Sequence, residues 1–247
     1  MNGPPERYEY WDIISKIDGW LGRGAAIRTM DILEYQELNG IRGPLLEIGV
    51  FKGKYFSVLL RSAIRTGENI LGIDTFDLVS LDSVRQTFAL TRVTHDGQIS
   101  LWRRASTSCT ANEIEAALGG RPRFISIDGS HEVPDVFWDM RLAEALLTDG
   151  GVVAVDDFLN PVTMGVNEAV FAFFARPRRF VPFAFIENKL FLSARGWSAR
   201  YREMLEDKAM NDDIEQHSAE FRRLLAIDRG LVDQRLWDAP VLLFRLL

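Results

Sequence analysis

Two clusters of chemically active side chains follow short apolar runs in the second half of the chain. Asp128 and His131 follow one run, and the pair Asp156 and Asp157 follows the next, a helix later. If both runs are neighbouring strands, three carboxylates and one imidazole gather at adjacent strand ends. Carboxylates so close together repel one another unless a cation or hydrogen-bond donors compensate, and an oxygen-rich cluster suits a hard divalent ion such as Mg²⁺. The first hypothesis is therefore a cation site.

The elements that must position these residues alternate in type between residue 45 and about residue 194. Short apolar runs alternate with longer segments of helical periodicity, a pattern typical of βα units on a parallel sheet. Glycine and proline residues at 119–122 and 149–151 end two of the helices and so locate the strands that follow. The strands are predicted at 45–50, 70–74, 99–103, 124–128 and 152–156.

A hairpin is predicted after the last of these strands. A helix over 166–174 precedes two apolar runs, 180–186 and 190–193, which are separated by a short polar turn. This pattern predicts an antiparallel hairpin at the edge of the sheet. The predicted fold is α/β, with a helical cap at 1–40, a Rossmann-like doubly wound and mostly parallel domain at 41–196, and a helical extension at 197–247.

Both ends of the chain have the periodicity of helices. The first forty residues are expected to form one or two helices that cover the sheet as part of a lid. Beyond Trp197, apolar positions recur among many charged ones, which favours either a solvated appendage or a surface for a substrate cap or a homodimer. These apolar positions are Tyr201, Leu205, Ile214, Phe221 and Leu225.

The composition argues against several classes of function. A net charge of −6 and a pI near 5.2 disfavour a nucleic-acid binder, which would carry clustered Lys and Arg. No apolar stretch approaches the roughly 20 residues that span a bilayer, and the start of the chain lacks a signal-peptide pattern. Cys109 is the single cysteine, so no internal disulfide can form. We expect a soluble cytoplasmic protein without nucleic-acid or membrane partners.

A glycine-bearing turn connects the first predicted strand to a helix. Gly49 and Gly53 lie in this turn, and Asp74 ends the next strand about twenty residues later. A βαβ unit presents a carboxylate to ribose hydroxyls at this distance, so a nucleoside-containing cofactor is a hypothesis. The middle glycine of the dinucleotide fingerprint is missing, which disfavours NAD and FAD. A tight strand-to-helix connection would also explain the glycines without any ligand.

Four motifs occur in order: Glu47, Gly49 and Gly53 in the first turn, Asp74 at the second strand end, Asp128-Gly129-Ser130-His131 at the fourth, and Asp156-Asp157 at the fifth. Together they resemble the class I S-adenosylmethionine-dependent methyltransferases over roughly residues 45–193. Within that superfamily the chain resembles the small-molecule group that includes the metal-dependent macrolide-sugar O-methyltransferases. More distantly it is similar to the catechol O-methyltransferases.

The resemblance implies a cofactor site along the first three strands. Asp128 could also contact the cofactor or the acceptor directly. The resemblance places Glu47 and Gly49 at the methionine part of S-adenosylmethionine, and Gly53 where the backbone approaches the cofactor closely. It places Asp74 at the ribose hydroxyls and Ser106 near the adenine.

The resemblance also implies a catalytic centre. Asp128, Asp156 and Asp157 match positions that hold Mg²⁺, and His131 matches the position of a base. A divalent ion bound to a substrate hydroxyl lowers its pKa, and a neutral imidazole can take the proton. The activity that this implies is Mg²⁺-assisted O-methylation of a small hydroxylated acceptor such as a sugar or natural product.

Three alternatives stay open. One acid of the Asp156-Asp157 pair could cap a helix and the other could hydrogen-bond a loop, without any metal. The enzyme would then be a metal-independent O- or N-methyltransferase with His131 as base. A nucleotide-dependent oxidoreductase could use the same kind of sheet. A non-catalytic cofactor-binding or scaffold protein could retain the fold. The sequence does not identify the acceptor.

Overall fold

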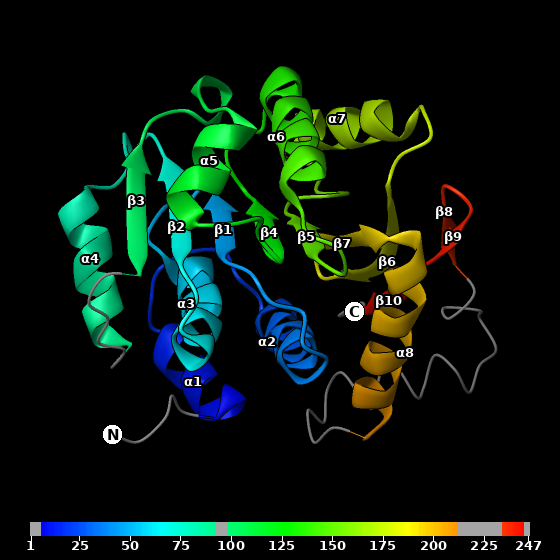
Figure 1. The fold of residues 1–247 in the computed structure, drawn as a ribbon, viewed down its shortest axis with the longest axis horizontal. Helices are drawn as coiled ribbons and strands as arrows, with labels where there is room; N and C mark the ends of the chain where they lie inside the picture. The colour runs from blue at the N-terminus through cyan, green and yellow to red at the C-terminus, as the bar shows by residue number, and fades with distance from the viewer. Residues whose placement is uncertain (1–5, 92–97, 212–233, 245–247) are drawn as a thin grey trace.

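A single mixed sheet forms the centre of the molecule. The computed structural model describes residues 6–91, 98–211 and 234–244, and its main sheet has eight strands in the order β10-β6-β7-β5-β4-β1-β2-β3 (Figure 1). All pairings are parallel except those of β7 with β5 and β6. The strands are β1 Leu45–Ile48, β2 Ile70–Asp74, β3 Ile99–Arg103, β4 Phe124–Ile127, β5 Val152–Val155, β6 Phe180–Ile186, β7 Lys189–Ala194 and β10 Leu242–Phe244; β8 Arg235–Leu236 and β9 Ala239–Pro240 form a separate ribbon.

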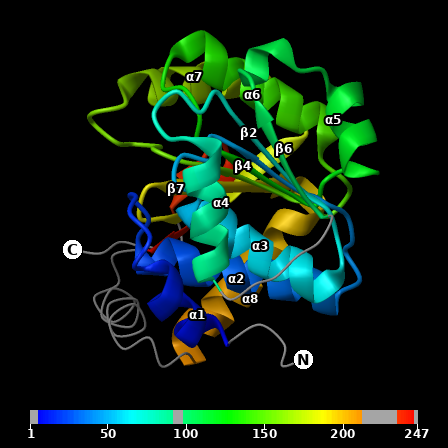
Figure 2. The ribbon, with the colours of Figure 1, turned by 90° about the vertical axis from the view of Figure 1, so that its left-hand side faces the viewer.

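Helices cover both faces of the sheet. α5, α6 and α7 lie on one face, and α1, α2, α3 and α8 on the other (Figures 1 and 2). The helices are α1 Arg7–Ile14, α2 Arg23–Leu38, α3 Lys54–Thr66, α4 Leu81–Leu90, α5 Ala111–Leu118, α6 Val133–Leu146, α7 Met164–Phe174 and α8 Arg195–Asn211, with a 3₁₀ turn η1 at Ser106–Ser108.

The strand sequences explain this two-sided arrangement. Successive side chains of a strand point to opposite faces, and here both faces are buried. Leu45 packs into the core under α1, α2 and α3, while its neighbour Leu46 packs into the core under α5, α6 and α7. Continuous apolar strands of this kind are typical of parallel sheets with helices on both sides. The predicted α/β Rossmann-like fold is confirmed.

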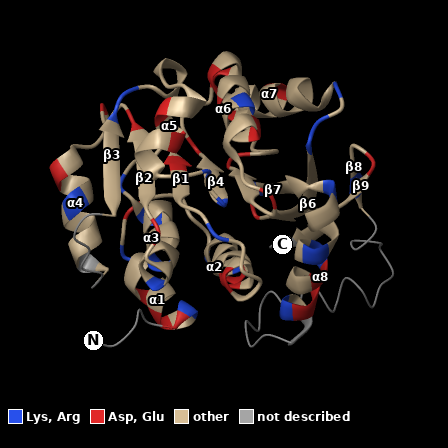
Figure 3. Ribbon diagram, in the orientation of Figure 1, with Lys and Arg blue, Asp and Glu red and all other residues tan. Residues whose placement is uncertain are grey.

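α8 joins the core rather than standing apart in solvent. Tyr201, Leu205 and Ala209, spaced four residues apart, are fully buried, and α8 contacts β6 and β7. Basic and acidic residues are interspersed along the rest of α8 (Figure 3). The predicted apolar positions Tyr201 and Leu205 thus form the packed face of this helix. Ile214, Phe221 and Leu225 lie outside the described residues.

The end of the chain departs from the expected helical extension. After the β8–β9 ribbon, β10 pairs in parallel with β6 and forms the edge of the sheet outside the predicted hairpin. The ribbon is held by Trp237, whose ring stacks on Phe174 at a centroid distance of 4.1 Å. A strand of three residues has no periodicity that a sequence can show. Among the described residues, no helix combines the length and apolarity needed to cross a bilayer.

Candidate active site

A cavity of about 730 Å³ opens at the carboxyl ends of β1, β2, β4 and β5. Ligands of doubly wound folds bind at this edge of the sheet, and the volume lies in the usual range for small molecules. Gly53 is the only predicted site residue that does not line the cavity. The predicted residues that do line it are Glu47, Gly49, Asp74, Ser106, Asp128, His131, Asp156 and Asp157.

The two glycines of the first turn make room for other parts of the chain. Gly49 has φ 87°, and a Cβ placed there would lie 1.8 Å from the carbonyl oxygen of Asp128. Gly53 has φ 80° and precedes α3, and a Cβ there would lie 2.8 Å from the ring of Phe88. Close packing of backbone and helix therefore accounts for both residues. Their contact with a cofactor stays a prediction.

Asp74 organises the rim of the cavity. One carboxylate oxygen accepts hydrogen bonds from the backbone N–H groups of Val50 and Phe51, both at 2.8 Å, and the other accepts from Phe76 at 2.7 Å. Phe51 and Phe76 have φ values of 47° and 53°, a strained conformation for bulky residues. Asp74 stabilises this conformation, and its predicted contact with ribose hydroxyls stays a prediction.

Ser106 also lines the cavity. It begins the 3₁₀ turn after β3, and its carbonyl oxygen accepts a hydrogen bond from the indole of Trp138 at 3.2 Å. The turn is thereby tied to α6, and its position near an adenine ring stays a prediction.

Glu47 brings a buried carboxyl to the floor of the cavity. It is 1% exposed, and its Oε2 atom has no hydrogen-bond partner among the described residues. Burial raises its pKa well above the ordinary range, against the opposing charge of Lys189. A buried acceptor or acid without a partner is costly, so this group could pair with a ligand donor.

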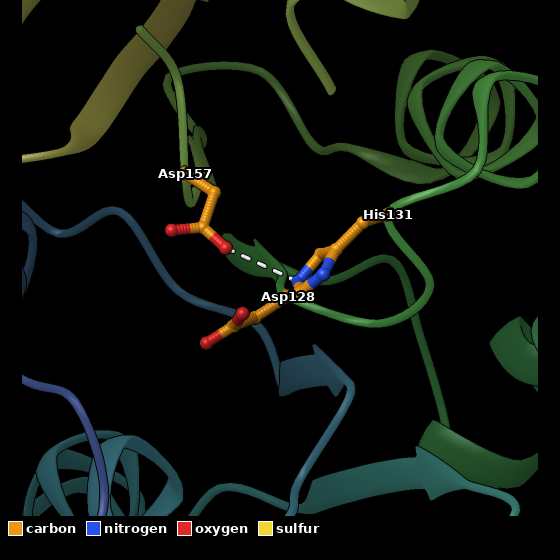
Figure 4. Close-up of side chains that lie close together, drawn as sticks. All are labelled: Asp128, His131 and Asp157. Carbon is orange, nitrogen blue, oxygen red and sulfur yellow. Dashed lines mark ion pairs between the residues drawn. The ribbon is translucent and has the colours of Figure 1, made fainter. Parts of the chain in front are cut away.

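His131 and Asp157 form a pair at the ends of β4 and β5. The Nε2 atom of His131 lies 3.1 Å from Oδ2 of Asp157, and the imidazole is half exposed (Figure 4). The hydrogen bond to Asp157 raises the pKa of His131, against a smaller effect of burial. The carboxylate therefore orients the ring and stabilises its protonated form.

Asp157 is itself held by two amides. Asn160 and Asn188 donate hydrogen bonds to its Oδ1 atom at 2.7 and 3.1 Å. The bond from His131 and these two amides lower the pKa of Asp157 to about 2, against the effect of burial. Its backbone has φ 59°, which Asp tolerates better than most residues. Asp157 is therefore charged and fixed at neutral pH.

Lys189 supplies a positive charge that the sequence analysis did not place. Its Nζ atom lies 2.8 Å from Oδ2 of Asp156 and 3.9 Å from Oδ2 of Asp128, and 4.1 Å from the ring centre of Tyr55. Burial alone would lower the pKa of this ammonium, but Asp156 and Asp128 outweigh it and raise the pKa. The pKa of the Asp128 carboxyl is raised well above its usual range, mainly by burial and secondly by the negative charge of Asp156.

The predicted set of metal ligands does not gather at one point. Among the described residues, the acids and histidines whose ligand atoms all lie within 4.8 Å of one another are Asp128, His131 and Asp157. Asp156 is turned toward Lys189 instead. Both oxygens of Asp157 already accept hydrogen bonds, and an imidazole is a poor ligand for Mg²⁺. The donor set does not fit a Mg²⁺ site well, and the ion stays a prediction.

The turn between β6 and β7 brings these groups together. Glu187 accepts hydrogen bonds from the first N–H groups of α2, at Gly24 and Ala25. Asn188 bonds Asp157, and Lys189 pairs with Asp156. The sequence did offer a signal for Lys189, because a lysine directly beside an apolar strand sequence can be buried only if it has a charged partner.

Comparison with known proteins bears on the fold and the type of domain. Residues 46–158 match the family model of a methyltransferase domain, whereas no curated protein sequence matches the chain. The solved structure of the O-methyltransferase NovP is 15% identical, with a TM-score of 0.57 over 68% of this chain and 80% of NovP.

Two further structures share the fold. CalS11, a TDP-rhamnose 3'-O-methyltransferase of calicheamicin biosynthesis, is 17% identical, with a TM-score of 0.54 over 67% of this chain and 77% of its own. An O-methyltransferase from Bacillus cereus in complex with SAH is 15% identical, with a TM-score of 0.52 over 75% of this chain and 88% of its own. Residues 46–158 thus match a methyltransferase domain, and the fold shared with these structures agrees with the predicted resemblance.

Proposed function

We propose that this methyltransferase domain transfers the methyl group of S-adenosylmethionine to a hydroxyl group of a small molecule, such as a sugar or natural product. The observation that carries the proposal is the His131–Asp157 pair, which lies at the cavity where β4 and β5 end. The cofactor would occupy the part of the cavity lined by Glu47, Asp74 and Ser106. Its methionine ammonium could donate to Oε2 of Glu47, which has no hydrogen-bond partner among the described residues.

The pair can perform the proton transfer that O-methylation needs. When Nε2 of the neutral imidazole donates to Asp157, Nδ1 is left as the acceptor of the hydroxyl proton. The oxygen then bonds to the methyl carbon, the carbon–sulfur bond breaks, and its electron pair neutralises the sulfonium. Asp157 stabilises the imidazolium that forms, and positioning of the two reactants supplies most of the remaining rate enhancement.

The similar structures support the choice of a hydroxyl acceptor. CalS11 is described as acting on the 3' oxygen of a sugar nucleotide, and the Bacillus cereus protein is described as bound to SAH. A Mg²⁺-assisted form of the reaction would hold the ion with Asp128 and Asp157. The ion pair between Lys189 and Asp156 favours the metal-independent form with His131 as base.

Calorimetry with the cofactor tests the proposal first. S-adenosylmethionine and SAH should both bind with one site per chain. NADH should not bind, because the first turn lacks the middle glycine of the dinucleotide fingerprint. Absence of any heat with S-adenosylmethionine and SAH would refute the proposed function. Binding without turnover on any of a broad set of hydroxylated acceptors would favour the scaffold alternative.

The pH profile should report the pairing of His131 with Asp157. The base must be neutral, and its pKa is raised. As the pH decreases, kcat should therefore fall with a midpoint above roughly 6.5, the ordinary pKa of His. The Asp157→Asn variant lacks the negative charge that raises the pKa of His131, so the midpoint should move down by about 1 pH unit. Asn also tolerates the positive φ of this position. The control Glu168→Gln, an exposed acid on α7, should leave the midpoint in place, and an unmoved midpoint in Asp157→Asn would contradict His131 as the base.

A further inference from the structure

We propose that Lys189 is the resident cation of the acceptor site, taking the place that a divalent metal ion would otherwise occupy. In this role it is a positioning residue, which acts through Asp156 and Asp128. The catalytic consequence is methyl transfer that needs no added metal, and this part of the inference rests on the proposed function. Its electrostatic consequence, that the native site has no affinity for divalent ions, can be tested without any substrate.

The first argument is the position of the ammonium. The neighbouring ends of β4 and β5 bring Asp128 and Asp156 close enough to interact, and adjacent carboxylates repel one another unless a positive charge compensates. The Nζ atom of Lys189 lies 2.8 Å from one and 3.9 Å from the other. The side chain of Lys189 is 2% exposed and that of Asp156 6%, so water does not screen this interaction as it would at the surface.

The second argument is that Lys189 is held in place. It is the first residue of β7 and pairs with Ile186 across the hairpin. The backbone N–H of Phe158 donates to the carbonyl oxygen of Asn188 at 3.0 Å, which joins the hairpin turn to the loop after β5. Above the ammonium lies the face of Tyr55, at 4.1 Å, a favourable contact for a cation. The charge is therefore part of the folded framework.

The third argument concerns what a divalent ion would meet. An ion held by Asp128 would lie close to an ammonium that is itself 3.9 Å from the same carboxylate. Two positive charges in a buried site repel strongly, and Asp156 would have to leave Lys189 to join the ion. Without Lys189 the same carboxylates would form an uncompensated acidic cluster, which is the usual environment of a bound Mg²⁺.

The experiment measures binding of Mn²⁺ as a probe for a divalent ion. Electron paramagnetic resonance titration of the wild-type chain should show only free Mn²⁺, and its Tm should be the same in EDTA as in excess Mg²⁺. Lys189→Met should bind one Mn²⁺ and should gain Tm on addition of Mg²⁺. Lys189→Arg keeps the charge and should behave as the wild type. Asp156→Asn added to Lys189→Met should remove the new site.

Two results would overturn the inference. One is stoichiometric Mn²⁺ binding by the wild-type chain that Asp128→Asn abolishes, a measurement that stands even if Lys189→Met does not fold. The other is a folded Lys189→Met that binds no Mn²⁺. Once an acceptor is known, wild-type turnover should persist in EDTA. Failure to bind S-adenosylmethionine would refute the proposed function alone, since Mn²⁺ binding needs neither cofactor nor acceptor.

Discussion

Replacement of His131 by glutamine is expected to lower kcat by about 10²–10⁴-fold, the usual contribution of a general base. Glutamine keeps a polar side chain that can still reach Asp157, but it cannot accept a proton at neutral pH. Affinity for S-adenosylmethionine should be unchanged, because the proposed cofactor part of the cavity is built by β1, β2 and the turn after β3. Steady-state kinetics with an identified acceptor, together with calorimetry for the cofactor, measure both quantities.

The matched control for this variant is Glu132→Gln. Glu132 is the exposed neighbour of His131, and its charge makes only the smallest of the contributions that raise the pKa of the imidazole. This control should keep kcat near the wild-type value. A His131→Gln variant that loses cofactor affinity and kcat together would assign the residue to cofactor binding. A variant that loses neither would remove His131 from the mechanism.

Replacement of Gly49 by alanine is expected to reduce the free energy of unfolding by about 4 kcal/mol, at the upper end of single substitutions. The new Cβ would lie 1.8 Å from the carbonyl oxygen of Asp128, and a backbone atom cannot turn aside as a side chain can. The positive φ of 87° adds a penalty of about 1–2 kcal/mol for any residue with a Cβ. Thermal denaturation should show a Tm lower by about 10 °C.

Gly40→Ala separates these two effects. Gly40 also has a positive φ, 70°, but a Cβ there would have no atom within 4 Å. This variant should therefore lose only the conformational part, about 1–2 kcal/mol. Equal losses in the two variants would show that the contact between Gly49 and Asp128 is not what requires glycine in the first turn.

Much of the fold could be predicted because its signals are local. The five predicted parallel strands start at the predicted residues and end at them or one or two residues earlier, because short strand-like runs and the turn residues beside them are visible in any short window. The hairpin was predicted for the same reason. β10 was not, because its three residues gain their strand conformation only by pairing with β6.

The site could be predicted in part, because parallel strands bring their carboxyl ends to one edge. That rule places Asp128, His131 and Asp157 together without any knowledge of side-chain contacts. It could not show that Asp74 holds the strained backbone at Phe51 and Phe76. Such hydrogen bonds depend on the path of a loop, which no periodicity describes.

The sequence by itself determined the order of βα units and the gathering of acids at one edge of the sheet, because both follow from the spacing of apolar residues along a parallel fold. Only the tertiary structure decided how those acids are compensated. Lys189 reaches Asp156 because the β6–β7 hairpin folds back beside β5, and a contact between residues so far apart in the chain depends on packing rather than on local pattern. That contact decides between an internal cation and a bound metal.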